Sequence, residues 1–183
     1  MMFSQKPTIL VYVQRNNLLL EGRKASAAKL SLPESLIANL EVVDKPQLLE
    51  LCRQFFENHN VRGQRALVVL DRAILFDKLL ADKTAALPQA IDDFRSAVPL
   101  NPEQRATVSY RLQQKTAVFV TNRDIYQSIS EALERAGAKL FGVTPAPAYG
   151  LPQQNPTKSE LIAHFLDDKE VVNQANFSRS LNG

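Results

Sequence analysis

The run Ala66–Leu70 limits the fold more than any other feature, because all five of its residues are apolar. A run this short and uniform is typical of a central strand that is covered on both faces. The run Ala117–Val120 has the same character, and amphipathic helical patterns lie between the apolar runs. We therefore predict an α/β (α+β) fold in which helices cover the faces of a mixed sheet.

The chain opens on a predicted hairpin. Apolar runs at Ile9–Val13 and Leu18–Leu20 flank four polar residues, Gln14 to Asn17. Asparagine tolerates the left-handed backbone of tight turns, which favours strand, turn and strand here. In many nucleotide-binding folds such a turn cradles a phosphate. This turn has no glycine to let a phosphate approach the backbone, and the chain contains neither G-x-x-x-x-G-K-[ST] nor G-x-G-x-x-G.

Three helices are predicted from cap residues and apolar spacing. Asp44 is an N-cap, and the helix that it opens is expected to stop near residues 58–60. A second helical pattern runs over residues 84–98. Asn122 caps a third helix, and Gly137 stands where a C-terminal glycine belongs.

The composition excludes several classes of protein. A net charge of +3 and a pI near 9.1, with scattered Lys and Arg, are too small to indicate a nucleic-acid partner. The single cysteine, Cys52, allows no disulfide framework, and its place on the apolar face of the first helix indicates a core residue rather than a nucleophile. No signal-peptide pattern and no membrane-spanning run is evident, so we expect a cytoplasmic protein.

Few residues offer catalytic or metal chemistry. Asp71 directly follows a buried run, where many α/β enzymes keep a nucleophile or a metal ligand, but a plain turn explains it equally well. His59, His164 and Cys52 form no H-x-x-x-H or C-x-x-C spacing. We predict no catalytic residue, no cofactor and no metal. The alternative is a small α/β nucleotide- or small-molecule-binding enzyme that uses Asp71.

Two stretches resemble the first domain of the type IV pilus assembly protein PilM family. The first contains a Leu-Pro pair, a small apolar segment, an Asp-x-x-x-Leu helix and a Gly-x-Arg strand, at Leu32-Pro33, residues 37–43, Asp44–Leu48 and Gly63–Leu70. The second contains an apolar strand, a helix, an Ala-Gly pair and a hydrophobic-x-Val segment, at Ala117–Val120, Ile125–Ala136, Ala136-Gly137 and Leu140–Val143. The likeness covers most of residues 8–150, and it depends on the order and spacing of these motifs.

The resemblance implies a ribonuclease H-like/actin-like domain over residues 1–150, with a small inserted lobe at about residues 74–112. Residues 151–183 are predicted to form a short helix, opened by the capping box Thr157–Glu160, and a polar tail. The tail from Asp167 onwards, with Phe177 as its only aromatic residue, is expected to be loosely held.

The family is actin-like, and its nucleotide lies between two halves of the fold, against a first loop of Asp-x-Gly-Ser pattern. Here the corresponding turn is Gln14–Asn17, without glycine or aspartate, and the residues after Gly150 are too few for a second half. The resemblance therefore implies a non-catalytic cytoplasmic scaffold of a type IV pilus or type II secretion platform. Its implied partner is a PilN-like inner-membrane protein. The resemblance implies that this partner, or a missing C-terminal anchor, holds the protein at the membrane. Whether the protein also forms a homo-oligomer is left open by the sequence.

The resemblance also places a candidate partner-binding groove between the inserted lobe and the main sheet. Five apolar residues are expected to line it: Ile74, Phe76, Leu87, Ile91 and Phe94. The competing interpretation is that all five pack the interior of the lobe. The two interpretations differ in exposure, because a recognition groove leaves part of each side chain accessible.

Overall fold

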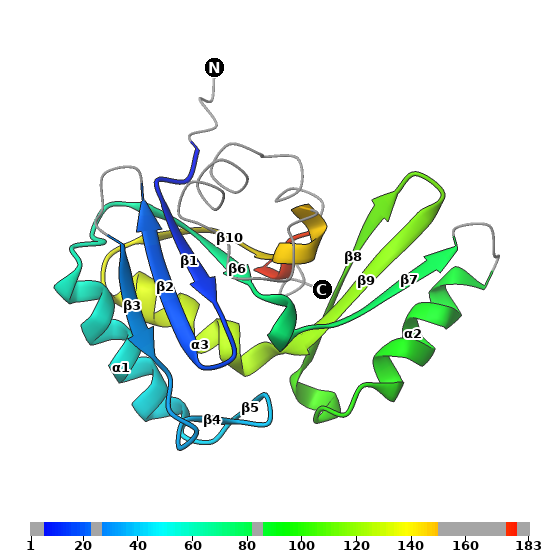
Figure 1. Cartoon of the computed structure of the whole chain (residues 1–183), viewed down its shortest axis with the longest axis horizontal. Coiled ribbons are helices and arrows are strands. Elements are labelled where there is room, and N and C mark those ends of the chain that lie inside the picture. The colour runs from blue at the N-terminus through cyan, green and yellow to red at the C-terminus, as the bar shows by residue number, and fades with distance from the viewer. Residues whose placement is uncertain (1–5, 23–26, 82–85, 150–174, 179–183) are drawn as a thin grey trace.

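The structure is a computed structural model that describes residues 6–22, 27–81, 86–149 and 175–178. Its main body is a five-stranded mixed sheet in the order β10-β6-β1-β2-β3 (Figure 1). β1 pairs antiparallel with β2 and parallel with β6, which is parallel to β10. The strands are β1 Ile9–Val13, β2 Asn17–Gly22, β3 Ala28–Ser31, β6 Arg65–Leu70 and β10 Lys139–Pro145. The predicted mixed α/β fold class is confirmed.

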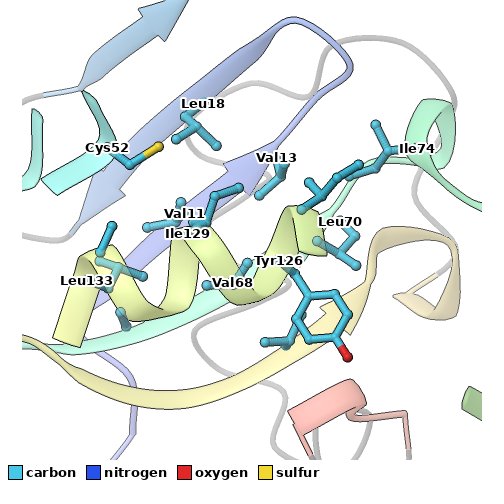
Figure 2. Packing of buried hydrophobic residues seen from close by; sticks show 14 of the residues in the cluster. Val11, Val13, Leu18, Cys52, Val68, Leu70, Ile74, Tyr126, Ile129 and Leu133 are labelled. Atoms are coloured by element: carbon cyan, nitrogen blue, oxygen red, sulfur yellow. The ribbon is translucent and has the colours of Figure 1, made fainter. Parts of the chain in front are cut away.

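The helices α1 (Lys45–Asn58) and α3 (Arg123–Arg135) pack against each other and cover one face of this sheet. Successive side chains of a strand point to opposite faces, so a fully apolar strand supplies both. Val11 and Val13 therefore join the large core under the helices, whereas Leu10 and Tyr12 join a second cluster on the other face. Figure 2 shows this core, in which Val11 and Leu18 of the sheet lie beside Cys52 of α1 and Ile129 of α3.

The predicted helix ends are confirmed. Asp44 accepts a hydrogen bond from the Gln47 amide (2.9 Å), and Asn122 accepts one from the Asp124 amide (2.9 Å). Gly137, just after α3, has φ +86°, and a Cβ there would lie 3.1 Å from Arg62 Cγ. Each cap acts within three residues of its helix end, which is why local sequence identifies it.

The small lobe is a three-stranded antiparallel sheet in the order β7-β9-β8, with α2 on one face (Figure 1). Its elements are β7 Phe76–Ala81, α2 Leu87–Ala97, β8 Arg105–Leu112 and β9 Lys115–Asn122. The sequence placed the lobe at about residues 74–112, but the lobe sheet extends to Asn122. The lobe sheet is larger because β9 pairs with both β7 and β8. The central position of β9 in this sheet also explains why its apolar run is buried.

A short hairpin connects β3 to α1, where the sequence indicates only a small apolar segment. It consists of β4 (Ile37–Ala38) and β5 (Glu41–Val42), joined by Asn39 (φ +50°) and Leu40 (φ +63°). A left-handed leucine is strained, because its Cβ crowds the backbone. The Leu40 side chain packs against the main core and also against the cluster of the lobe. The hairpin therefore bridges the two bodies.

The described part of the tail, residues 175–178, does not match the expected loose tail. Phe177 is fully buried, and its ring centroid lies 5.7 Å from that of Tyr126 on α3. The Asn176 side-chain oxygen accepts a hydrogen bond from the Val143 amide of β10 (3.0 Å). The prediction of a loose tail is therefore wrong for these residues. The predicted helix after Thr157 lies outside the described residues.

Candidate functional site

The turn of the first hairpin is a surface turn whose backbone bonds within the protein. The Gln14 amide donates to the Asn17 carbonyl (2.8 Å), and the Asn16 carbonyl accepts from the Leu32 amide (2.7 Å). Arg15 and Asn16 are exposed. No glycine and no carboxylate stands in the turn, so it offers neither a close backbone approach nor a ligand for a metal-bound water.

Asp71 lies at the carboxyl end of β6, where open α/β sheets commonly bind ligands. Both of its carboxylate oxygens have partners: one accepts from the Ala73 amide (2.8 Å), and the other accepts from the Tyr12 hydroxyl (2.7 Å). Burial raises the pKa of Tyr12 far above its usual value, and the hydrogen bond to Asp71 raises it further. These contacts let the carboxylate cap the short 3-10 turn Arg72–Ile74 and hold a buried hydroxyl.

The structure brings together only part of the predicted partner-binding set. Phe76 and Phe94 lie half-buried on a small cluster formed by Val98, Leu100 and Val120. Leu87 and Ile91 are also half-buried, and α2 has no fully buried residue. Ile74 is separate from them, since it is 2% exposed and belongs to the main core. Four of the five side chains thus keep accessible area on the lobe, and their role in partner binding stays a prediction.

A second apolar area of the lobe was not selected from the sequence. Leu79 is 51% exposed and Leu112 is 41% exposed. Together with Tyr110 they border a shallow hollow of about 750 Å³ at the outer end of the sheet, on the face turned away from α2. The available signal in the sequence is the strict alternation of apolar and polar residues over 105–112, which places Tyr110 and Leu112 on one face of a strand.

A groove between α3 and β10 was also missed. It has a volume of about 340 Å³, and its lining includes Tyr126, Ser130 and Glu134 of α3, which face Leu140 and Val143 of β10. The sequence pointed to α3 only through its apolar stripe. The adjoining stripe at residues 126, 130 and 134 follows the same four-residue spacing, and that spacing was the available signal.

The described residues offer little other chemistry. No group of three or more His, Cys, Asp or Glu side chains in residues 6–22, 27–81, 86–149 and 175–178 lies close enough to hold a metal ion. No helix in the same ranges is long and apolar enough to cross a membrane.

No protein-family model matches the chain, and no curated protein does. Solved structures do match. The chain is similar to a chain of a "PilM-PilN type IV pilus biogenesis complex", with a TM-score of 0.54 and 16% identity over 79% of this chain and 49% of that chain. The likeness shows a shared fold. Because the match covers 49% of that chain, the present chain spans about half the length of its PilM-PilN match.

Two further solved structures are similar. One is the cytoplasmic domain of EpsL, an inner-membrane component of the type II secretion system of Vibrio cholerae, with a TM-score of 0.50 and 10% identity over 80% of this chain and 60% of that chain. The other is a Bacteroides thetaiotaomicron protein described as having an actin-like ATPase fold, with a TM-score of 0.44 and 11% identity over 75% of this chain and 52% of that chain. At these identities the EpsL likeness, too, concerns the fold alone.

Proposed function

We propose that this chain is a non-catalytic scaffold of a type IV pilus or type II secretion assembly platform, located at the inner face of the cytoplasmic membrane. In this proposal its partner is the cytoplasmic segment of a PilN-like membrane protein. The observation that carries the proposal is the fold shared with a chain of a PilM-PilN complex. The absence of catalysis is supported by the engaged carboxylate of Asp71 and by the turn at Gln14–Asn17.

The lobe is the proposed docking surface. Phe76, Leu87, Ile91 and Phe94 keep accessible apolar area there, which a short apolar segment of the partner would bury. Phe94 is the strongest candidate anchor, because aromatic side chains at the centre of an interface dominate binding energies. The Lys78 ammonium lies 5.7 Å from the centroid of its ring and adds a charged group at the edge of the surface.

The Phe94→Ala substitution tests the docking surface. If Phe94 anchors the partner, the affinity for a synthetic peptide of the partner's cytoplasmic segment falls by about 2 kcal/mol or more, while stability changes little. If Phe94 only packs the lobe, the same substitution costs roughly 3–5 kcal/mol of folding free energy. Calorimetric titration with the peptide and thermal unfolding of the same variant measure both quantities.

Phe141→Ala is the matched control. Phe141 is also half-buried, but it packs on the second face of the main sheet, with Leu10 and Leu67. We expect this variant to keep the peptide affinity of the unmodified protein. A Phe94→Ala protein that binds the peptide normally, or that is strongly destabilised, contradicts the proposed anchor.

The same proposal predicts that the protein does not bind ATP with magnesium. The residues at Gln14–Asn17 supply no glycine for a phosphate and no carboxylate for a magnesium-bound water. Isothermal titration of ATP, with and without magnesium, is expected to show no saturable heat. Magnesium-dependent binding in the micromolar range would refute this prediction and revive the enzyme alternative.

A further inference from the structure

The groove between α3 and β10 has the size and the lining of a small-molecule site. Its volume of about 340 Å³ lies within the range of ordinary ligand pockets. Leu140 and Val143 form its apolar wall, and residues 126, 130 and 134 of α3 form the opposite wall. Ser178, from the docked tail residues, also lines it. The groove is therefore built from a helix, a strand and an anchored segment.

Two buried hydroxyl groups line this groove; that of Tyr126 lies within reach of the Arg123 side chain, and that of Ser130 has no hydrogen-bond partner among the described residues. Tyr126 is 1% exposed and Ser130 is 8% exposed. In Figure 2 the Tyr126 hydroxyl points toward the segment 175–178. Buried polar groups are nearly always hydrogen-bonded, because an unpaired one keeps its full desolvation cost. A ligand with its own polar group would supply the missing partner.

The charges along the groove favour a cation at one end. Glu131 and Glu134 lie in the last turns of α3, where the helix dipole also leaves partial negative charge. Arg135 pairs with Glu131 (2.6 Å), and Lys45, which also lines the groove, pairs with Asp124 (2.9 Å). Glu134 is exposed in the last turn of α3, so a positive group of a ligand would meet a carboxylate there.

We propose that this groove binds a small amphipathic amine. Its apolar body lies against Leu140 and Val143, its ammonium group lies near Glu134, and its polar group bonds the hydroxyls of Ser130 and Tyr126. This site is independent of the docking surface on the lobe, so its test does not depend on the scaffold proposal.

Tyramine is a suitable probe, because it carries a hydroxyl group, a ring and an ammonium group. Its neutral analogue 4-ethylphenol and its acidic analogue 3-(4-hydroxyphenyl)propionate are the matched ligands. For a ligand of this size we expect a Kd on the order of millimolar, measured by NMR titration. Tyramine should bind about fivefold tighter than 4-ethylphenol, as one helix-end charge contact allows, and the propionate should bind weakest.

Three variants locate the binding. Ser130→Leu fills the groove and should weaken tyramine about tenfold or more, whereas Glu134→Gln should abolish the preference for tyramine over 4-ethylphenol. Asp92→Asn, which removes an exposed carboxylate on α2 of the lobe, should change neither.

Three results would overturn the proposal. The first is the absence of saturable tyramine binding at millimolar concentration. The second is equal binding of tyramine and 4-ethylphenol, which removes the cationic class of ligand. The third is tyramine binding that survives both Ser130→Leu and Glu134→Gln, which locates it elsewhere. If Ser130→Leu does not fold, Glu134→Gln alone decides, since its exposed side chain does not support the core.

Discussion

Replacement of Phe177 by alanine is expected to lower the free energy of unfolding by about 3–5 kcal/mol. The ring is fully buried against Tyr126, and its removal leaves a cavity that the strand β10 and the helix α3 cannot close without moving. For a chain of this length the loss corresponds to a fall in Tm of roughly 6–20 °C. Chemical denaturation and differential scanning calorimetry measure the two quantities.

The control for this prediction is a local one. Asn176→Ala removes the acceptor of the Val143 amide at the edge strand but leaves the aromatic contact in place. We expect faster hydrogen exchange at Val143 in this variant, with a smaller loss of stability than in Phe177→Ala. A Phe177→Ala protein within about 1 kcal/mol of the unmodified protein would show that residues 175–178 are not part of the core.

The tail also shows what the sequence could not reveal. Asn176 and Phe177 follow a polar stretch, and their partners Val143 and Tyr126 lie 33 and 51 residues earlier. Composition describes a segment by itself, and it predicts loose structure when few apolar residues are present. A single phenylalanine is enough to anchor the segment if residues far away in the sequence form an apolar pocket that accepts its ring. Only the three-dimensional arrangement supplies that pocket.

The opposite holds for the helix ends and the main strands. The caps Asp44, Asn122 and Gly137 act within a few residues, so the sequence alone identifies them. The apolar run of β6 likewise predicts a strand with two covered faces, because each of its residues must be buried. These local signals predicted the mixed sheet correctly.

Partner choice among strands was harder to predict. The run Ala117–Val120 is apolar, and the same pattern suits the main sheet or a separate one. Pairing with β7 and β8 assigns it to the lobe, and no residue within the run encodes that choice. The prediction of the candidate site failed in part for the same reason, because Ile74 and Phe76 lie two positions apart in sequence but pack in different clusters. Both residues are apolar, so the sequence predicts a packing role for each. The arrangement of the main sheet and the small lobe places them in separate clusters.

Cys52 is expected to react with thiol reagents at least about a thousandfold more slowly than an exposed cysteine. Burial raises the pKa of its thiol to about 12, against an ordinary value of 9.0, and the thiolate is the reacting species. A shift of about three pKa units lowers the thiolate fraction near pH 8 by about three orders of magnitude. The side chain is also 0% exposed, on the face of α1 that packs against the sheet. Alkylation followed by mass spectrometry measures the rate.

The reference for this rate is an exposed thiol in the same fold, Leu79→Cys in a Cys52→Ala background, because Leu79 is 51% exposed. A native Cys52 that reacts as fast as this reference would contradict the packing of α1.

The remaining slow reaction of Cys52 passes through opening of the core, and its rate therefore follows the population of the open state. In a Phe177→Ala protein a loss of about 3–5 kcal/mol should accelerate it by about two to three and a half orders of magnitude, since each 1.4 kcal/mol is a factor of ten. An unchanged alkylation rate would mean that residues 175–178 detach alone, while the core around Cys52 stays closed.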